Sequence, residues 1–478
     1  MFEKIKSGML VFLIVSSMFL TYRLWFGQPP LEKESEPHYE EVFFTAPPVS
    51  SRIIQPAQII FYDNDRGIHL YRRGSRGFDR LWSKSLNIIK ENVELNNAKN
   101  ISKSDLEGLT ATFSSRLVYN FEPSMPLMFM TGTSVFEDIT FEGAVFLWDE
   151  ELVYVIFVGE ENFLLPLGRT EDLQRVLLPV LDNPHKLLPP AIELALPRDE
   201  DNKDGVKNEA GEGDEKEADD IGIAPGDGGD IKDSNEQQLS WEIETRGEIF
   251  VPEGEIRVAE VRLKEEKIDR EQLVRAFFID LSLARLIEER DGALYYTDGE
   301  KGLRIYPSGL VEFSFPRLDR NLGNISYSLV LQKGAESLSL YGGWPSGAYL
   351  EEAENRGRGR GYRLLWGTNH KGLAFEGEQI GCEMEINNQG VLFYRRNIYL
   401  AEEDIPGEMP FRPYEEALYQ VISLNEQYFK ENTPVLLALE PVYYIPPAEK
   451  VEKAIPAWSV HFQGMEKKYL HWVTLDPL

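Results

Sequence analysis

The sequence is poor in three kinds of residue that carry familiar chemistry. It has one cysteine, Cys382, among 478 residues, so an internal disulfide and a cysteine-rich zinc site are excluded. It has only six histidines, and none stands in an H-E-x-x-H pair. Basic residues are also in deficit, since 50 Lys and Arg face 80 Asp and Glu and leave a net charge of −30. That deficit argues against a nucleic-acid-binding protein, which needs a basic face to displace counterions.

Motifs typical of enzymes are missing as well. The chain has no Walker loop and no G-x-G-x-x-G, and Ser346 in the string GWPSG lacks the spacing of a nucleophile elbow. Asp280 and Asp298 fit a helix surface and a turn better than they fit a pair of catalytic acids. We therefore predict a non-enzymatic protein with no catalytic, cofactor-binding or metal-binding residues.

The acidic residues are unevenly distributed along the chain. Residues 198–238 hold 15 acidic and 5 basic side chains, so this segment carries −10 of the total charge of −30. It has few large apolar residues and cannot bury enough surface to offset its chain entropy, which predicts a flexible linker. A calcium-binding loop is the alternative, because Asp199, Asp201 and Asp204 precede Gly205, but the closing Glu of such a loop is missing.

One hydrophobic run is long enough to cross a membrane. Residues 8–26 are mostly apolar and would form roughly 28 Å of helix at about 1.5 Å per residue, enough to span a bilayer core. Lys4 and Lys6 precede the run and acidic residues follow it, so the positive-inside rule predicts a cytoplasmic N-terminus and an extracytoplasmic bulk. A cleaved signal peptide is the alternative, but bulky residues stand where a peptidase requires small ones.

Two small polar residues lie within this predicted membrane helix. Ser17 and Thr21 are four positions apart, a spacing that lets a partner helix approach closely. The alternative is that both are simply tolerated in a single span. We treat them as candidate partner-binding residues. The Pro- and Glu-rich residues that follow predict an extended tether to residue 56.

The remaining chain alternates strand and helix patterns, which predicts an α+β fold of antiparallel sheets with packed helices. Before the acidic segment, residues 58–62 match a buried strand and residues 78–89 match an amphipathic helix. Residues 144–148 and 152–158 match the two strands of a β-hairpin.

Beyond the acidic segment the pattern resumes with a strand at residues 256–264. Residues 269–289 give the strongest helix pattern, with Asp269 as N-cap and apolar residues over most of the circumference, so we expect a long buried helix. Further elements are expected as strands at 293–296, 303–306 and 310–315, a helix at 413–430, and strands at 435–444, 457–462 and 469–474.

Two stretches of this region resemble each other. Residues 297–303 (TDGEKGL) resemble residues 368–373 (TNHKGL), and residues 308–313 (SGLVEF) resemble residues 389–394 (QGVLFY). A duplicated unit of one helix plus antiparallel strands would explain the similarity, and so would chance recurrence of turn chemistry.

One basic cluster stands out in the acidic chain. Residues 356–363 read RGRGRGYR and could bind phosphate, an acidic partner or the acidic segment itself, or form a solvated loop. Cys382 lies in an expected strand, where a buried and inert thiol is the default interpretation.

Several strings resemble the YycH family, and they extend over nearly the whole chain. They are FLTYRLW at residues 19–25, RAFFIDLSLAR at 275–285, EERDG at 288–292, YTDG at 296–299, LYGGWP at 340–345, LEPVY at 439–443 and PAW at 456–458. The acidic segment is a departure from the family pattern.

This resemblance implies a regulator. Proteins of the YycH family are single-pass membrane proteins of Gram-positive bacteria that act with a YycI-like protein on the sensor histidine kinase WalK, which controls cell-wall metabolism through WalR. The resemblance also implies three outer α+β domains, the last of them YycI-like, and contact with the kinase through the membrane helix. An anchored cell-wall enzyme and a ligand-sensing module are the alternatives.

Together these patterns predict seven consecutive parts of the chain. They are a cytoplasmic stub (1–7), a membrane helix (8–26), a tether (27–56), a first α+β domain (57–197), an acidic linker (198–238), a middle α+β domain (239–320) and a C-terminal α+β domain (321–478).

Overall fold

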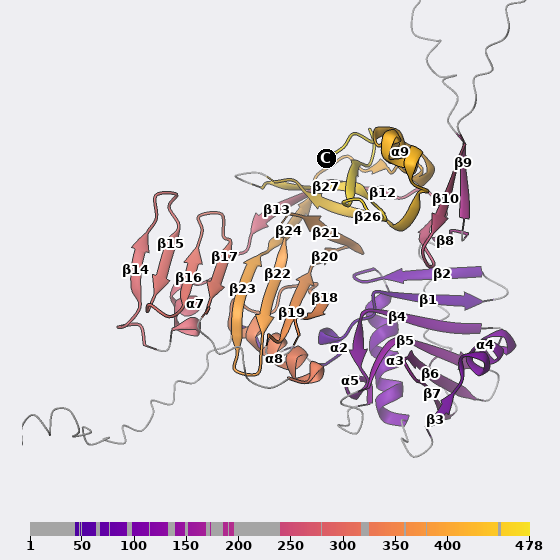
Figure 1. Cartoon of the computed structure of the whole chain (residues 1–478), viewed down its shortest axis with the longest axis horizontal. Coiled ribbons are helices and arrows are strands. Elements are labelled where there is room, and N and C mark those ends of the chain that lie inside the picture. The colour runs from indigo at the N-terminus through magenta and orange to yellow at the C-terminus, as the bar shows by residue number, and fades with distance from the viewer. Residues whose placement is uncertain are drawn as a thin grey trace, which may run out of the picture. The chain divides into compact units, whose positions relative to one another are not determined.

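The computed structural model (Figure 1) describes residues 44–478 apart from 47, 49, 64–66, 76, 93–97, 114, 132–138, 149–151, 169–172, 174–184, 190, 196–239, 279, 317–324, 358–359, 379 and 448–450. The predicted stub, the membrane helix with Ser17 and Thr21, the tether as far as residue 43 and the acidic segment lie outside these residues. Within the described part, none of the helices is both long enough and apolar enough to cross a membrane.

The first sheet is antiparallel and has seven strands in the order β2-β1-β4-β5-β6-β7-β3. The long helix α3 (Phe78–Asn92) packs on one face through Leu81, Trp82 and Ile89, which are at most 2% exposed. Helix α4 (Lys103–Thr112) packs on the other face, beside Leu147 and Ile156. The strands are β1 (Gln58–Asp63), β2 (Gly67–Arg72), β3 (Lys99–Ile101), β4 (Ser115–Pro126), β5 (Thr140–Trp148), β6 (Val153–Gly159) and β7 (Asn162–Gly168), with short helices α2 (Ser50–Ile53) and α5 (Met128–Thr131) beside them.

The second sheet is also antiparallel and has eight strands in the order β14-β15-β16-β17-β23-β22-β19-β18. It consists of two halves that meet where β17 pairs with β23. In chain order the first half is α7 (Arg270–Phe277), β14 (Arg285–Glu288), β15 (Leu294–Thr297), β16 (Gly302–Ile305) and β17 (Val311–Ser314). The second half is α8 (Tyr327–Leu340), β18 (Tyr349–Asn355), β19 (Tyr362–Gly367), β22 (Gly381–Ile386) and β23 (Val391–Asn397).

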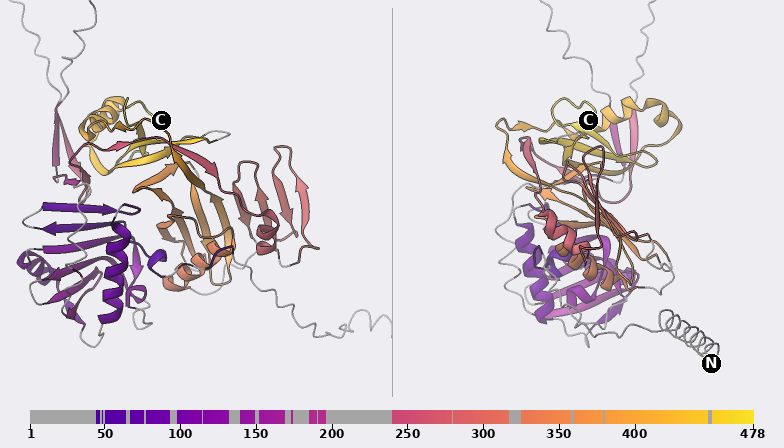
Figure 2. Two further views of the ribbon diagram at one scale, coloured as in Figure 1. Left: turned by 180° about the vertical axis from the view of Figure 1, so that it is seen from behind. Right: turned by 90° about the vertical axis from the view of Figure 1, so that its left-hand side faces the viewer.

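The two halves have the same order of elements, one helix and then four antiparallel strands. Both helices lie on one face of the sheet (Figure 2), since Phe277 of α7 stacks on Phe313 and Gly334 of α8 packs against Leu364. Phe313 lies opposite Tyr394 at the centre, which places the strings 308–313 and 389–394 on adjacent strands. The arrangement supports the duplicated unit for this pair of strings. Residues 297–303 and 368–373 do not match in the same way, because 297–303 form the β15–β16 hairpin whereas 368–373 enter strands of the third sheet.

The third sheet has nine strands, and it includes the two strands that precede and follow the acidic segment in the sequence. Its main order is β20-β21-β26-β27-β13-β24; β10 pairs with β9 and β26, and β28 pairs with β27. Helix α9 (Tyr414–Leu424) packs on it through Leu418, Val421 and Ile422. The strands are β9 (Ala191–Ala195), β10 (Ser240–Thr245), β13 (Val261–Glu265), β20 (Asn369–His370), β21 (Leu373–Gly377), β24 (Tyr399–Asp404), β26 (Val435–Ile445), β27 (Lys453–Phe462) and β28 (Lys468–His471). Two small ribbons, β8 (His185–Leu187) with β11 (Phe250–Pro252) and β12 (Arg257–Val258) with β25 (Met409–Pro410), complete the strands.

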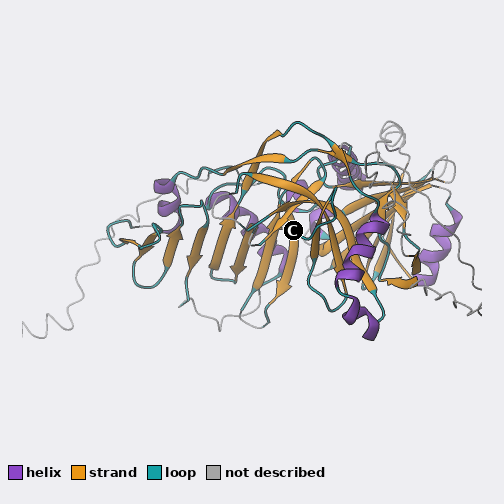
Figure 3. Cartoon of the chain, turned by 90° about the horizontal axis from the view of Figure 1, so that it is seen from above, coloured by secondary structure: helices purple, strands orange, loops and turns teal. Residues whose placement is uncertain are grey.

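The predicted α+β class is confirmed, and strands are more numerous than helices in the described residues (Figure 3). The helix expected at 78–89 and the hairpin at 144–158 are present as α3 and as β5 with β6. The helix expected at 413–430 is divided into α9 and α10 (Glu426–Glu431) at Asn425, whose side-chain Nδ2 donates to the Val421 carbonyl at 2.8 Å. The eight-stranded sheet takes strands from both sides of residue 320, and the predicted division into domains stays a prediction.

The prediction of one long helix over residues 269–289 is wrong. Asp269 does cap a helix, because its carboxylate accepts the Gln272 N–H at 2.7 Å, but α7 ends at Phe277. Beyond it the Asp280 carboxylate accepts hydrogen bonds from the N–H and hydroxyl of Ser282, which stabilises a turn in place of helix. The chain then enters β14, and Leu286 and Ile287 of that strand are exposed.

Candidate functional site

The described residues contain no obvious chemical centre. No three or more of their His, Cys, Asp and Glu side chains are grouped so as to hold a metal ion. The candidate partner-binding residues Ser17 and Thr21 lie in the part of the chain that the structure does not describe. The functional features are therefore sought in contacts that link distant parts of the chain.

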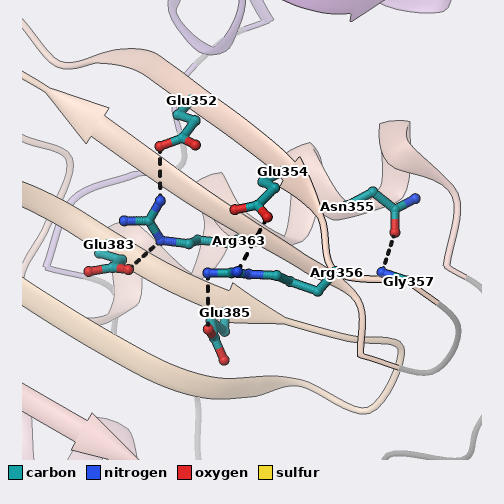
Figure 4. A network of polar contacts seen from close by, with 8 residues as sticks. All are labelled: Glu352, Glu354, Asn355, Arg356, Gly357, Arg363, Glu383 and Glu385. Atoms are coloured by element: carbon teal, nitrogen blue, oxygen red, sulfur yellow. Dashed lines mark hydrogen bonds and ion pairs between the residues drawn. The ribbon is translucent and has the colours of Figure 1, made fainter. Parts of the chain in front are cut away.

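Arg356 and Arg363 of the basic cluster lie on the face of the eight-stranded sheet that the helices leave open (Figure 4). Arg363 lies between Glu352, at 2.9 Å, and Glu383, at 2.5 Å. Arg356 approaches Glu354 at 3.3 Å and Glu385 at 3.9 Å. Both guanidinium groups thus already have carboxylate partners. For Arg356 and Arg363 this pairing argues against an open phosphate site and favours a network that stabilises the strands.

The alternation of charge continues along this face. Arg395 contacts the same Glu383 at 2.7 Å, and Arg304 contacts Glu289 at 2.8 Å. Arg395 is on β23 and Arg304 is on β16, and the opposite face of both strands is the one on which the helices pack. Opposite charges on neighbouring strands stabilise a sheet by a few tenths of a kcal/mol up to about 1 kcal/mol per pair.

The most informative contact joins the beginning of the described chain to the second half of the eight-stranded sheet. Phe44 and Thr45 donate their backbone N–H groups to the Ser339 carbonyl in the last turn of α8, at 3.1 and 3.5 Å. The Trp344 N–H in turn donates to the Thr45 hydroxyl at 2.8 Å. We call this group of contacts, formed by residues 44–45 with Ser339 and Trp344, the N-terminal clip.

Glycine makes the close approach at the clip possible. Gly343 has a φ of +91°, a conformation that residues with a side chain rarely adopt. A Cβ atom there would lie 3.1 Å from the Thr45 Cγ2 and 3.3 Å from the Phe44 Cβ. The family-like string LYGGWP at 340–345 therefore forms the surface on which residues 44–45 rest.

A buried arginine, Arg396, hydrogen-bonds to the glycine on which the clip rests. Arg396 is 1% exposed, and its Nη1 donates to the Gly343 carbonyl at 2.8 Å. Its Nε and Nη2 form two parallel hydrogen bonds, each 2.7 Å, with the carboxylate of Glu266. This bidentate pair connects the clip, through β23, to the segment that leads into α7.

Aromatic side chains fill the space around this arginine. The Tyr394 hydroxyl donates to the Tyr341 carbonyl at 2.6 Å, and Phe277 stacks on Tyr341 with ring centroids 4.1 Å apart. Cys382 lies beside Arg396 and is fully buried, and burial raises the pKa of its thiol to about 11. The prediction that Cys382 is buried is confirmed.

A polar cavity of about 350 Å³ lies among β2, β18, β21 and β26. Arg73 lines it and donates to the carbonyls of Pro56 at 2.7 Å and Gln55 at 2.9 Å, and burial lowers the pKa of its guanidinium to about 10. Burial, and then the charge of nearby Glu376, raise the pKa of the Glu351 carboxyl. Lys467 approaches Glu376 at 3.2 Å. A second ion pair in the lining joins Arg72 to Glu440 at 3.8 Å, so part of the charge in this cavity is already paired.

Sequence reasoning missed the residues that form the clip and its support. Arg396 directly follows Arg395, and Glu266 is one of many acidic residues, so nothing in their spacing pairs them. The one usable signal was the adjacent Gly342 and Gly343, since neighbouring glycines often mark a close backbone approach.

Comparisons with known proteins support the resemblance to the YycH family. Residues 3–130 match the family described as "YycH protein, N-terminal domain". The sequence matches no curated protein. Among solved structures, the fold is similar to that of YycH from Bacillus subtilis, with a TM-score of 0.57 at 13% identity over 89% of this chain and 97% of the other. An uncharacterized protein from Eubacterium rectale aligns with 50% of this chain and 90% of its own at 9% identity, with a TM-score of 0.31. Residues 3–130 are therefore similar to the N-terminal domain of the YycH family, and the chain has a fold similar to a YycH structure over most of its length, which supports the resemblance to the YycH family.

Proposed function

We propose that this protein is a non-enzymatic, membrane-anchored regulator of a WalK-like sensor histidine kinase that controls cell-wall metabolism through a WalR-like regulator. The observation that carries the proposal is the family match, which begins at residue 3 and therefore includes the hydrophobic run at 8–26. In this proposal that run is a single membrane helix, the short N-terminal stub is cytoplasmic and the bulk of the chain is extracytoplasmic, in a Gram-positive cell.

The N-terminal clip suggests how such a helix would act on the outer part of the protein. A membrane helix can regulate only by binding one state of a partner better than another, typically with a coupling of about 1–3 kcal/mol. A displacement of the helix would reach residues 44–45 first, and these residues are hydrogen-bonded to α8 and to Trp344. Arg396 bonds both to Gly343, beside the clip, and to Glu266, before α7, so a shift at the clip would alter contacts in both halves of the sheet.

The partners in this proposal are a WalK-like kinase and a YycI-like protein. Ser17 and Thr21 form the small face through which the membrane helix contacts one of them. The last of three outer domains is the YycI-like one, and the division at residues 197, 238 and 320 belongs to the same proposal. None of these assignments requires a cofactor.

The test is to scramble residues 16–21 in the full-length protein while keeping their mean hydropathy. We expect altered phosphorylation of the response regulator in cells, at unchanged protein level and membrane insertion. A matched control scrambles residues 9–14 of the same helix, away from Ser17 and Thr21. Equal output from both variants and the unaltered protein would exclude the helix contact.

A second candidate, a cell-wall hydrolase, is favoured by one observation. The polar cavity brings together Glu351, whose carboxyl pKa is raised, and Glu376, a combination that acid catalysis can use. The regulator proposal predicts no turnover of peptidoglycan by the purified full-length protein. Turnover that disappears in the Glu351→Gln variant would establish the enzyme instead.

A further inference from the structure

The polar cavity of about 350 Å³ is lined by strands of all three large sheets. Gln58 and Arg72 belong to the first sheet, Tyr349 and Glu351 to β18 of the second, and Glu376 to β21 of the third. Sites for small molecules in proteins typically have volumes of about 300–1,000 Å³, so this cavity has room for a small ligand. A molecule bound in it would contact all three sheets.

Negative charge is in excess in the lining. Two of the basic side chains are already paired, Arg72 with Glu440 at 3.8 Å and Lys467 with Glu376 at 3.2 Å. A cavity with an excess of one charge attracts ligands of the opposite charge, so this lining favours a cation. The lining has five carboxylates and three basic side chains, and these are Glu122, Glu248, Glu351, Glu376 and Glu440 with Arg72, Arg73 and Lys467.

The third basic side chain does not pair with a carboxylate. Arg73 is 9% exposed, and its Nε and Nη2 donate to the carbonyls of Pro56, Gln55 and Glu122 at 2.7, 2.9 and 3.3 Å. In the part of the chain that the structure describes, the Glu351 carboxylate therefore has neither a hydrogen-bond donor nor an ion-pair partner. A carboxylate in this setting lacks the donors that normally stabilise its charge.

A buried tyrosine adds a second unpaired oxygen to the same wall of the cavity. Tyr349 is 8% exposed, and its hydroxyl forms no hydrogen bond with any described residue. A Cβ atom on Gly367 would lie 2.8 Å from this hydroxyl and 3.0 Å from the Glu351 Oε2, so the two oxygens lie close to the same point. Buried polar groups nearly always have a hydrogen-bond partner, and these two oxygens together point to a ligand that donates hydrogen bonds.

We propose that this cavity binds a small organic dication, an aliphatic diamine. One ammonium group donates hydrogen bonds to the Glu351 carboxylate and the Tyr349 hydroxyl, and the second offsets the remaining negative charge of the lining. A metal ion fits less well, because no three of the described His, Cys, Asp and Glu side chains are grouped so as to hold one. The inference rests neither on the proposed kinase nor on the membrane topology.

The test is calorimetric titration of the full-length protein in detergent with 1,4-diaminobutane. Glu351→Gln removes the charge but keeps the size of the side chain, and we expect it to weaken binding about tenfold. The matched control is Glu354→Gln, which removes the same charge from the same strand at a residue that does not line the cavity. This control should bind the diamine as tightly as the unaltered protein does.

A second variant tests the hydroxyl without a change of charge. Tyr349→Phe keeps the ring, over which the Arg73 guanidinium lies 4.5 Å from the centroid, and removes one hydrogen-bond acceptor. We expect about fivefold weaker binding. The urea midpoint of each variant without ligand shows whether it folds, so weaker binding can be told apart from unfolding.

Several results would overturn the inference. No binding of 1,4-diaminobutane at millimolar concentration would mean that the cavity holds only water. Equal affinities in Glu351→Gln and Glu354→Gln would show that the diamine associates with the acidic surface in general. Equally tight binding of 1-aminobutane would contradict a site for two charges. Binding of Mg²⁺ that also depends on Glu351 would replace the organic ligand by a metal ion.

Discussion

At the scale of single residues, the buried ion pair of Arg396 and Glu266 is the strongest constraint on the sheet. Arg396 is 1% exposed and holds both the Glu266 carboxylate and the Gly343 carbonyl. Replacing it by leucine would leave both acceptors without their donor. We expect Arg396→Leu to lower the free energy of unfolding by about 3–5 kcal/mol, measured by urea titration of the full-length protein in detergent.

An exposed pair provides the control for that measurement. Arg262 contacts Glu403 at 2.6 Å, but both side chains are more than half exposed. Arg262→Leu should change the stability by less than about 1 kcal/mol. Similar losses in the two variants would contradict the special role assigned to Arg396.

Cys382 gives a second prediction at this scale. Burial raises the pKa of its thiol to about 11, whereas an ordinary free thiol titrates near 8.5. Only the thiolate reacts with alkylating reagents, so Cys382 should resist iodoacetamide at pH 9 and react at once in denaturant. Mass spectrometry of the labelled protein measures this directly, since the chain has one cysteine. Rapid labelling of the folded protein would show that the thiol is accessible.

The burial and the ion-pair partners of charged residues could not be predicted from the sequence. The cluster at 356–363 was conspicuous in the sequence, yet Arg363 is neutralised by Glu352 and Glu383 from neighbouring strands. Arg396 was inconspicuous in the sequence, yet its side chain is buried and that of Arg363 is partly exposed. Burial and partners of a charge depend on strand register, which a single sequence does not specify.

At the scale of elements, local patterns predicted the amphipathic helix α3 and a minority of the strands, among them β1, β5 and β6. They failed at 269–289, where leucines at helical spacing belong to a turn and an edge strand. The N–H and the hydroxyl of Ser282 both donate to the Asp280 carboxylate, at 2.8 and 2.6 Å, and these hydrogen bonds stabilise the turn in place of the helix. The pairing of the two repeated halves could not be predicted, because it depends on contacts between residues about 80 positions apart.

The pairing of β9 with β10 gives the prediction at this scale. Ala195 lies opposite Ser240, so the two ends of the acidic segment are already held together. Replacing residues 197–238 by a two-residue Asn-Gly turn should leave the fold intact. Closing a shorter loop costs less entropy, so stability should rise by about 2 kcal/mol, measured as a higher urea midpoint.

A matched replacement tests whether length or charge matters. A linker of the same length in which the acidic residues are replaced by Ser and Gly should leave the midpoint close to that of the unaltered protein. A loss of folded protein on shortening would mean that the acidic segment contributes contacts of its own to the fold.

At the scale of the whole molecule, the clip is the place where the N-terminal segment meets the sheets. The string LYGGWP has no catalytic residue, but its Gly342 and Gly343 let Arg396 and residues 44–45 approach from two sides. A regulator needs such a connection, because a displacement at one end must alter contacts at the other.

Gly343→Ala is the decisive variant for this connection. Alanine at a φ of +91° is strained, and its Cβ would press against Thr45 and Phe44. The control is Gly299→Ala in the β15–β16 turn, where φ is +93° and a Cβ would meet nothing within 4 Å. Both variants should lose about 1–2 kcal/mol from backbone strain, but only Gly343→Ala should speed hydrogen exchange at the amides of Phe44 and Thr45. If the clip transmits the signal, only Gly343→Ala should also alter phosphorylation of the response regulator. Faster exchange at the clip with unchanged phosphorylation would show that the signal takes another route.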